Sequence, residues 1–313
     1  KVMTSREIVR RTLNYEHPER VAHSFEESDV CWAACSVKTR ATEWQEVGSR
    51  WERTDEWGNL WARLDATSKG EVAKGVLTDL AELETYEFPD YSREQDYAHI
   101  KIRRENHADK WLIGEMPGFA FNIARKMRKL EQYLMDVLLE KDRIHEFHNR
   151  IDRMLEDMIR NYAAVGVDCV MFPEDWGTQK QTLISPKIWR VEFFPRFKKL
   201  CGIAHDLGIK VFMHSCGQIE AIVPGLIEAG MDVLQFDQPD LHGIDTLAEH
   251  QKHNKITFWC PIDIQTTLQS RDEHIIRAKA REMLDKLWQG RGGFIAGYYE
   301  DNASIGLDPK WQA

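Results

Sequence analysis

The sequence predicts an α/β protein with the (β/α)₈ architecture of a TIM barrel, as a single domain over residues 1–313. Its length fits one barrel of about 250 residues with additions. The second half alternates short apolar runs with helix-like stretches, which is typical of parallel strands joined by helices. Polar side chains follow each apolar run, at the strand ends where the active sites of such barrels lie.

A short motif marks the strands of the second half. Glycine, any residue and then aspartate or lysine precede an apolar run at Gly166, Gly208 and Gly230. Each run is short and nearly continuous, as in a strand buried on both faces. A helix-like stretch ends at each glycine, a residue that commonly terminates helices. Two further strands are expected over 256–260 and 293–297.

The first half of the chain is less regular. Residues 5–14 predict a helix, and strands are expected over 20–25 and 111–115. One or two helices are expected over 119–139. Residues 54–90 contain several glycines and a proline, and they predict an excursion of strands and loops. We therefore expect elaborations from the amino-terminal part to lie over the barrel mouth.

The amino-acid composition disfavours several classes of protein and of partner. The 42 Lys and Arg against 51 Asp and Glu give a net charge of −9, which disfavours nucleic acid and polyanionic substrates. No apolar run approaches the roughly 20 residues of a membrane span, so no membrane partner is expected. The six cysteines form no paired framework, which indicates reduced thiols and a cytoplasmic location. Exposed apolar helices would support a homodimer.

His214 and Cys216 form the sharpest pair of candidate metal ligands. Residues two apart on an extended segment point to the same side, so an imidazole and a thiolate would face one point, as in zinc sites. Cys260 at a neighbouring strand end is a candidate third ligand. Asp237 or Glu174 would be a fourth ligand, or that position stays open for substrate. The alternative is a hydrogen-bonded histidine beside two small buried thiols.

Glu174 and Asp175 are adjacent at one strand end, so they face opposite ways. One is expected to face the barrel axis as an acid–base group or ligand, and the other to cap the following turn. The sequence leaves open which carboxylate is functional. Asp237 completes the set of candidate catalytic residues.

Aromatic and amide side chains near the strand ends predict a wall for a small substrate. Rings there would hold a flat, apolar ligand, although edge packing explains each ring equally well. The substrate-binding candidates are Trp176, Gln179, Gln238, Trp259, Asp263, Tyr298 and Tyr299.

The chain resembles the uroporphyrinogen decarboxylase-like superfamily over nearly its whole length. The motifs that carry the resemblance are Glu-Asp-Trp-Gly-Thr-Gln at 174–179, His-Ser-Cys-Gly at 214–217 and Pro-Ile-Asp-Ile-Gln at 261–265. Thr-Ser-Arg-Glu at 4–7 and the glycines at 292–293 extend it toward both ends. The resemblance implies a (β/α)₈ barrel.

The superfamily that the chain resembles contains two kinds of enzyme. Porphyrinogen decarboxylases carry a basic segment after the first strand, whereas residues 24–29 here read Ser-Phe-Glu-Glu-Ser-Asp, so we expect no such activity. The other branch consists of cobalamin-dependent methyltransferases, several of which bind zinc through a His-x-Cys pair and a later cysteine. His214 and Cys216 match the pair. The chain has Tyr298 or Tyr299 where that cysteine falls in the coenzyme M methyltransferases.

The resemblance thus implies a methyltransferase that moves a methyl group from a small substrate, foremost an aromatic methyl ether (O-demethylation), to the Co(I) corrinoid of a partner protein. A zinc ion or a carboxylic acid would stabilise the departing phenolate. The chain has no Asp-x-His-x-x-Gly cobalamin motif, which places the corrinoid on the partner. Alternatives are transfer from methylcobamide to a thiol or to tetrahydrofolate, and a non-catalytic corrinoid- or tetrapyrrole-binding scaffold.

Overall fold

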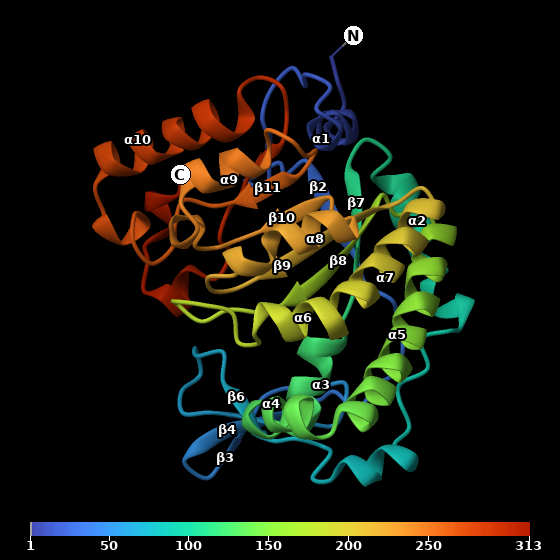
Figure 1. Cartoon of the computed structure of the whole chain (residues 1–313). Coiled ribbons are helices and arrows are strands. Elements are labelled where there is room, and N and C mark those ends of the chain that lie inside the picture. Colours follow the sequence, from blue (N-terminus) through green and yellow to red (C-terminus); the bar gives the residue numbers. More distant parts are fainter. Residues whose placement is uncertain (1) are drawn as a thin grey trace.

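Eight parallel strands form the central sheet of the protein in the computed structural model, which describes residues 2–313 (Figure 1). Their order is β1-β12-β11-β10-β9-β8-β7-β2, so the strands from β7 to β12 lie side by side in chain order, with β2 beside β7 and β1 beside β12. The ends of the series, β1 and β2, are linked by one short connection, in which Asp29 N donates to His23 O at 3.0 Å. This arrangement confirms the (β/α)₈ barrel. The strands are β1 (Ala22–His23), β2 (Val30–Ala33), β7 (Trp111–Glu115), β8 (Cys169–Glu174), β9 (Lys210–Ser215), β10 (Val233–Gln235), β11 (Thr257–Cys260) and β12 (Phe294–Ala296).

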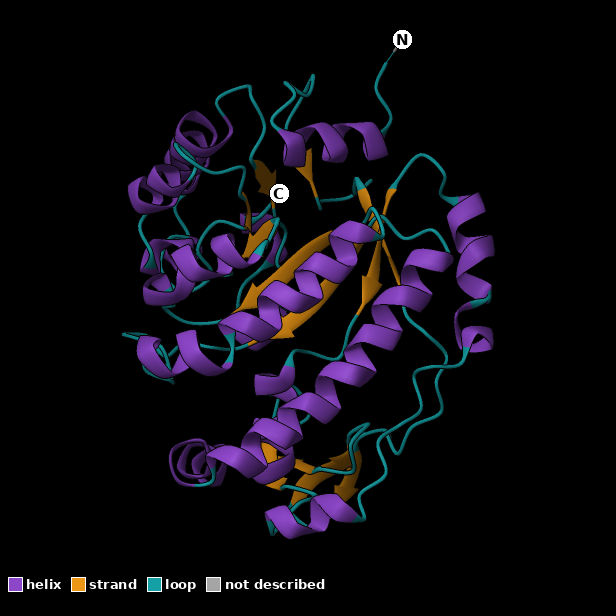
Figure 2. Cartoon of the chain, turned by 45° about the vertical axis from the view of Figure 1, so that its right-hand side comes forward, coloured by secondary structure: helices purple, strands orange, loops and turns teal. Residues whose placement is uncertain are grey.

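Helices surround the central sheet, as Figure 2 shows. The helix expected over 5–14 is confirmed, and the region 119–139 forms two helices. The helices are α1 (Ser5–Asn14), α2 (His99–Asn106), α3 (Ala120–Arg128), α4 (Leu130–Leu139), α5 (Lys141–Ala164), α6 (Pro186–Glu192), α7 (Phe194–Asp206), α8 (Val223–Ala229), α9 (Ile244–His250) and α10 (Glu273–Met283).

Side chains from the strands fill the barrel interior, and α1 closes its amino-terminal end. Ile8, Val9 and Leu13 of α1 belong to the same buried cluster as the inward-facing strand residues. Trp32, Phe212 and Trp259 lie in this cluster as well, and Phe212 and Trp259 also line the cavity at the opposite end. The barrel is therefore a filled core with one accessible end, the carboxyl ends of the strands. The remaining strand residues of this cluster are Ala22, Val30, Trp111, Ile113, Cys169, Val233 and Ile295.

The aspartates of the repeated glycine motif fix the register of the strands. A carboxylate oxygen of Asp168 accepts the backbone N–H of Leu112 at 2.8 Å, and Asp232 accepts that of Val211 at 2.8 Å. Arg104 donates to Asp168 at 2.7 Å and balances its charge. These residues lie at the start of their strands, so the motif is structural rather than part of the site.

A second sheet is inserted between β2 and β7 and lies apart from the barrel strands, in the lower part of Figure 1. It begins earlier than residue 54, where we expected the excursion to start. The backbone N–H of Leu77, just after the last strand of this sheet, donates to Met127 O of α3 at 2.9 Å, and Lys126 of α3 lies 5.6 Å from the centre of the Trp61 ring. The insertion is thereby attached to the barrel through α3. Its antiparallel strands are β3 (Gln45–Val47), β4 (Arg50–Thr54), β5 (Leu60–Arg63) and β6 (Glu71–Lys74).

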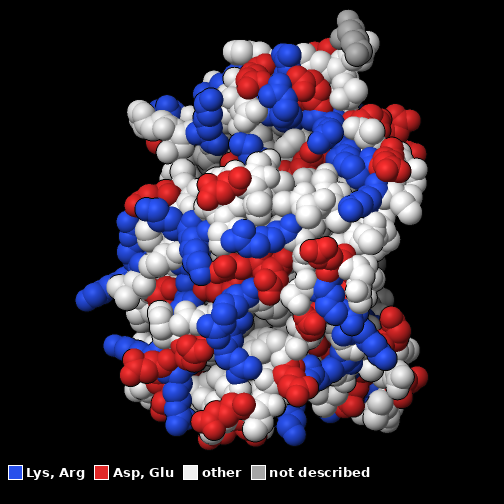
Figure 3. Space-filling view, turned by 90° about the vertical axis from the view of Figure 1, so that its right-hand side faces the viewer, with Lys and Arg blue, Asp and Glu red and all other residues white. Residues whose placement is uncertain are grey.

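The surface of the molecule mixes both signs of charge. On the face shown in Figure 3, Lys and Arg side chains are interspersed with Asp and Glu side chains. The net charge of −9 is therefore not gathered into one acidic patch on this face. Within residues 2–313, the helices are too short or too polar to cross a lipid bilayer.

The buried side chain of His242 can make its hydrogen bond to the backbone only when the ring is neutral. His242 is 6% exposed, its ring stacks on Phe236 with centroids 4.2 Å apart, and its Nε2 accepts the backbone N–H of Ile219 at 3.2 Å. A protonated ring could not accept this hydrogen bond. Burial lowers the pKa of His242 from its usual 6.5 to about 4.

We expect His242 to make the fold sensitive to acid. The unfolded chain binds a proton at this ring below pH 6.5 and the folded chain only below about 4, so stability falls as pH decreases through this window. Between pH 7 and 5 this loss is about 2 kcal/mol. Urea unfolding of His242→Gln should therefore show a weaker pH dependence than the wild type. The exposed His253→Gln should match the wild type, and equal pH dependence in all three proteins would contradict the assignment.

Candidate metal centre

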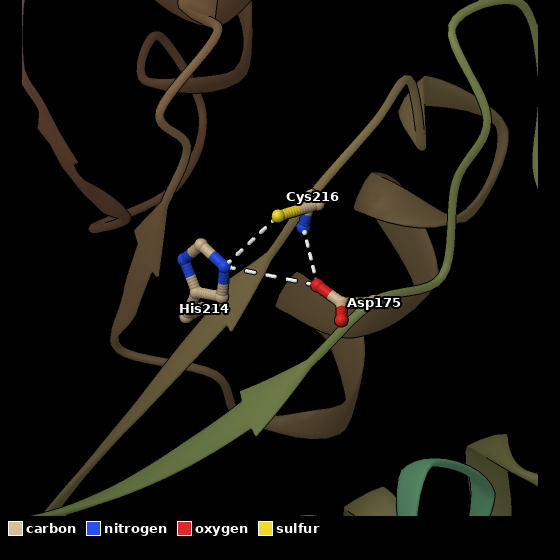
Figure 4. A group of neighbouring side chains, drawn as sticks. All are labelled: Asp175, His214 and Cys216. Carbon is tan, nitrogen blue, oxygen red and sulfur yellow. Dashed lines mark hydrogen bonds and ion pairs between the residues drawn. The ribbon is translucent and has the colours of Figure 1, made fainter. Parts of the chain in front are cut away.

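Three side chains from the ends of β8 and β9 converge at the barrel mouth (Figure 4). His214 lies on β9, Cys216 follows that strand, and Asp175 follows β8. His214 Nε2 lies 3.3 Å from Cys216 Sγ and 3.8 Å from Asp175 Oδ1. One ligand atom from each residue lies within 4.8 Å of the others. The predicted His214–Cys216 pair thus faces one point, and Asp175 completes a group of three.

Two glycines bring the loops after β8 and β9 into contact. A Cβ atom on Gly217, whose φ is +77°, would lie 2.3 Å from the backbone of Gly177, so no larger residue fits there. The backbone N–H of Gln218 donates to Thr178 O at 2.7 Å across the same crossing. The glycines of the Glu-Asp-Trp-Gly and His-Ser-Cys-Gly motifs therefore hold Asp175 beside Cys216.

The ring of His214 is oriented by a partner that the sequence analysis did not identify. Its Nδ1 donates to Oε1 of Gln235 on β10, and the Gln235 amide in turn donates to Asp237 Oδ1 at 2.8 Å. With its proton on Nδ1, the imidazole presents the lone pair of Nε2 to Cys216. Gln235 is the last residue of β10 and Asp237 follows it by two positions, and this spacing of two was the signal available in the sequence.

Asp175 is positioned by an arginine from α3. Arg125 donates to Asp175 Oδ2 at 3.0 Å, and its Nε donates to Asn122 Oδ1 at 2.8 Å. The other oxygen of Asp175 accepts the backbone N–H of Cys216 at 3.3 Å. One carboxylate oxygen is thus held by the guanidinium, and the other faces His214 and Cys216.

The donor set fits a zinc ion. A tetrahedral zinc with bonds of about 2.1 Å to nitrogen and 2.3 Å to sulfur holds these two atoms about 3.6 Å apart. The corresponding separation here, from His214 Nε2 to Cys216 Sγ, is 3.3 Å. Burial raises the pKa of the Cys216 thiol, and the carboxylates of Asp175 and Asp237 raise it further, although the residue is accessible to solvent. A metal would therefore be needed to hold this sulfur as a thiolate at neutral pH. These three protein ligands would leave the fourth position of a bound zinc ion for a substrate atom.

Cys260 does not join this group, which corrects the ligand set expected from the sequence. Trp259 faces the barrel interior, where it stacks on Phe212 with centroids 4.8 Å apart. Alternation along β11 turns the adjacent Cys260 outward, and it lies 1% exposed in the cluster between strands and helices. Burial raises the pKa of its thiol.

Alternation also separates the two adjacent carboxylates. Glu174 faces outward and is 1% exposed, and one of its oxygens accepts the backbone N–H of Phe119 at 2.7 Å. Burial raises the pKa of Glu174 to about 8. Asp175 is therefore the carboxylate that faces the barrel axis, and Glu174 supports the start of α3.

A cavity of about 1220 Å³ opens beside the metal-ligand group at the barrel mouth. His214 and Gln235 form part of its wall. Two substrate-binding candidates, Trp259 and Tyr298, lie in this wall, while Trp32 is an aromatic residue that the sequence analysis did not single out. The aromatic residues of the wall are Phe25, Trp32, Phe212, Trp259 and Tyr298, and its charged residues are Glu26, Glu27, Glu300 and Lys310.

Trp176 and Asp263 lie outside the cavity wall and have structural contacts. Trp176 is fully buried and stacks on Phe121 with centroids 4.0 Å apart, because its position after β8 turns it toward α3. Asp263 is 1% exposed, and its Oδ1 accepts the backbone N–H groups of both Gln265 and Thr266 at 3.0 and 2.9 Å. We therefore do not retain these two residues as substrate contacts.

The remaining candidates surround the site without lining the cavity. Gln179 donates to Oε1 of Gln238 at 3.0 Å, which joins the loops after β8 and β10. Tyr299 is 9% exposed and packs on Ile264 and Leu307, with its hydroxyl directed to Lys69 at 3.2 Å. These residues connect neighbouring loops at the rim of the barrel.

The fold and the site define a (β/α)₈ barrel with a His-Cys-Asp group at the carboxyl ends of its strands. Comparison with known families agrees with this class, because residues 66–298 match the family described as Uroporphyrinogen decarboxylase (URO-D). The match covers most of the chain, so the protein belongs to this family. No curated protein matches the sequence.

Solved structures share the fold at low sequence identity. A methyltransferase from Methanosarcina mazei is 14% identical with a TM-score of 0.54, and the similarity covers 96% of this chain and 82% of that chain. A B12-independent methionine synthase from Shewanella sp. W3-18-1 is 10% identical with a TM-score of 0.43, over 88% and 72% of the two chains. Only the first likeness is close enough to support the shared fold.

The opposite orientations of Cys216 and Cys260 predict different reactivities. Cys216 is exposed, whereas Cys260 lies behind the barrel wall. A neutral maleimide applied to the native protein should therefore label Cys216 first, and Cys216→Ser should remove this rapid phase. Mass spectrometry of the labelled peptides measures the order. Loss of the rapid phase in Cys260→Ser, with the phase retained in Cys216→Ser, would contradict the structure.

Proposed function

We propose that this chain is a corrinoid-dependent methyltransferase that moves a methyl group from an aromatic methyl ether to the Co(I) corrinoid of a partner protein. The observation that carries the proposal is the position of His214, whose ring belongs both to the three-residue group and to the wall of an aromatic cavity. Membership of the URO-D family and the fold shared with a methyltransferase agree with this proposal.

The charge of the cavity argues against porphyrinogen decarboxylation. Glu26, Glu27 and Glu300 line it, with Lys310 as the basic residue of the wall. A tetrapyrrole with many carboxylates would be repelled by these side chains. The acidic segment after the first strand, from which we expected this exclusion, therefore supplies part of the cavity wall.

The aromatic wall would bind and orient the methyl donor. Phe212 and Trp259 stack on each other, and the ring of Trp32 lies 6.2 Å from each of theirs. A flat ring placed against these side chains would present its ether oxygen to the group formed with His214 and its methyl carbon to the open mouth. A partner's corrinoid docked there would supply Co(I) as the nucleophile for the methyl carbon, and the electron pair of the breaking C–O bond would stay on the ether oxygen.

The chain's own residues prepare the site for this reaction. Asp175, His214 and Cys216 would hold a zinc ion, which when bound supplies a Lewis acid for the departing oxygen. Gln235 and Asp237 keep the His214 ring in the orientation that presents Nε2. In this proposal Asp175 replaces Cys260 among the ligands, and Asp237 acts through His214.

The polar group and the aromatic wall separate the alternatives from this proposal. A non-catalytic scaffold needs no convergence of polar side chains, and the convergence at 175, 214, 216, 235 and 237 therefore favours an enzyme. A methylcobamide:thiol or tetrahydrofolate methyltransferase would use the same metal group. The aromatic wall favours an aromatic donor over an aliphatic thiol.

We expect about one zinc ion per chain after reconstitution of the protein with zinc. Asp175→Ala, His214→Ala and Cys216→Ser should each lose the metal on dialysis, because three ligands hold it. Elemental analysis measures the content, and Cys260→Ser is the matched control, which should retain zinc. Zinc loss in Cys260→Ser with retention in Asp175→Ala would restore the ligand set expected from the sequence.

We expect the zinc-loaded protein to convert 2-methoxyphenol and reduced cob(I)alamin to a phenol and methylcobalamin, followed by visible absorbance. His214→Ala should lower the rate about 10²- to 10³-fold, because stabilisation of the leaving oxygen is lost. Coenzyme M and tetrahydrofolate, each with methylcobalamin, form the comparison set. Turnover of these acceptors without turnover of any methyl ether would contradict the proposed direction and substrate class.

A further inference from the structure

The loops after β1 and β12 bring three carboxylates to the wall of the cavity at the barrel mouth. Glu26 and Glu27 lie in the connection that follows β1, and Glu300 follows β12. These two strands are parallel neighbours, and the backbone N–H of Tyr298 joins their loops by donating to Ser24 Oγ at 3.0 Å. The three carboxylates therefore form one acidic edge of the cavity.

The acidic edge lies across the barrel from the candidate metal centre. In the closed order of the eight strands, three strands separate β1 from β9 on either side, and three separate β12 from β8. The acidic edge follows β1 and β12, whereas His214 lies on β9 and Asp175 follows β8. His214 and the acidic edge line the same cavity. A ligand that fills this cavity would therefore have one end at the metal-ligand group and the other at the carboxylates.

The carboxylates of the acidic edge are free to interact with a ligand. All three residues are exposed, and within residues 2–313 none of them forms an ion pair or a side-chain hydrogen bond. Arg20, the arginine nearest to Glu26 along the chain, is already bound to Asp29. Lys310, the basic residue of the wall, lies 3.7 Å from Asp308, whose charge offsets its own. The cavity therefore carries uncompensated negative charge at this edge.

Aromatic rings beside the carboxylates also suit a cation. Phe25 and Tyr298 line the cavity together with the acidic edge, and their rings meet edge to face with centroids 5.9 Å apart. The face of an aromatic ring attracts an ammonium group, and this attraction adds to that of a carboxylate. The rings of Trp32, Phe212 and Trp259 belong to the barrel core and supply the apolar floor of the cavity. The cavity therefore offers an apolar floor to a ring and an anionic edge to a positive charge.

We propose that Glu26, Glu27 and Glu300 make the cavity selective for a methyl donor with a cationic group, namely an aryl methyl ether that carries an aminoalkyl substituent. This inference rests on the proposed function and narrows its substrate class. Because the acidic edge lies opposite the metal-ligand group, it binds the part of the donor that does not react. The ammonium lies between the carboxylates and the rings beside them, and the ether lies at His214. An aryl ether with a carboxylate substituent is repelled from the same position.

Isothermal titration calorimetry with three para-substituted anisoles tests the proposal without methyl transfer. Methoxyphenethylamine, ethylanisole and methoxyphenylpropanoate have side chains of similar length that end in an ammonium, a methyl group and a carboxylate. The wild type should bind the ammonium compound about tenfold more tightly than the neutral ether, and the carboxylate compound about tenfold more weakly. Because the acidic edge is exposed, a higher ionic strength should reduce both differences.

Neutralising the acidic edge should remove most of this preference. The triple variant Glu26→Gln/Glu27→Gln/Glu300→Gln should prefer the ammonium compound only about twofold, which is the part that the rings retain. Its affinity for the neutral ether should equal that of the wild type, because the apolar floor is unchanged. A matched control removes three exposed glutamates outside the cavity wall, changes the net charge equally and should keep the tenfold preference. The control substitutions are Glu46→Gln, Glu84→Gln and Glu131→Gln.

Three outcomes overturn the proposal and differ in their meaning. Equal affinities of the wild type for the three ethers would remove the charge selectivity and leave the proposed function intact. A tenfold preference that survives in the triple variant of the acidic edge would show that these carboxylates do not determine it. A wild type that binds none of the three ethers, with a native circular dichroism spectrum, would overturn the aromatic methyl donor and the proposed function with it.

Discussion

Alternation of side chains along parallel strands decides which residues reach the barrel mouth. His214 and Cys216 are two apart and face inward, while Ser215 between them is 1% exposed and accepts the backbone N–H of Trp176. The same rule turns Asp175 inward and Glu174 outward at the end of β8. Because neighbouring side chains on a strand point to opposite faces, each inward position gives its side chain to the barrel interior or its mouth, and each outward position gives its side chain to the core between strands and helices.

Contacts between the strands then bring these inward positions to one point. The crossing of the loops at Gly177 and Gly217 requires the absence of Cβ atoms, and it sets the distance between Asp175 and Cys216. The amide of Gln235 fixes the imidazole from the neighbouring strand. Each ligand is thus held by a group that has no contact with a metal, which is the arrangement that limits reorganisation when an ion binds.

The sequence predicted the features that depend on local patterns. Buried parallel strands read as short apolar runs, so β8, β9 and β7 were located closely, and the spacing of His214 and Cys216 gave the pair. Cys260 was misassigned because the inward orientation of Trp259, which turns it outward, becomes visible only in the folded barrel. The contact of Lys69 with Tyr299 depends on the path of a whole inserted sheet, and no short sequence pattern reports it.

The central claim is that one cysteine, one histidine and one aspartate hold a metal at the barrel mouth. X-ray absorption spectroscopy of the zinc-loaded protein tests it most directly, because sulfur and lighter ligands scatter at different distances. The account predicts one sulfur at about 2.3 Å and nitrogen or oxygen ligands at about 2.0–2.2 Å. Two sulfurs on the zinc would contradict it, since the second would have to come from a thiol such as Cys260 that the structure places behind the barrel wall.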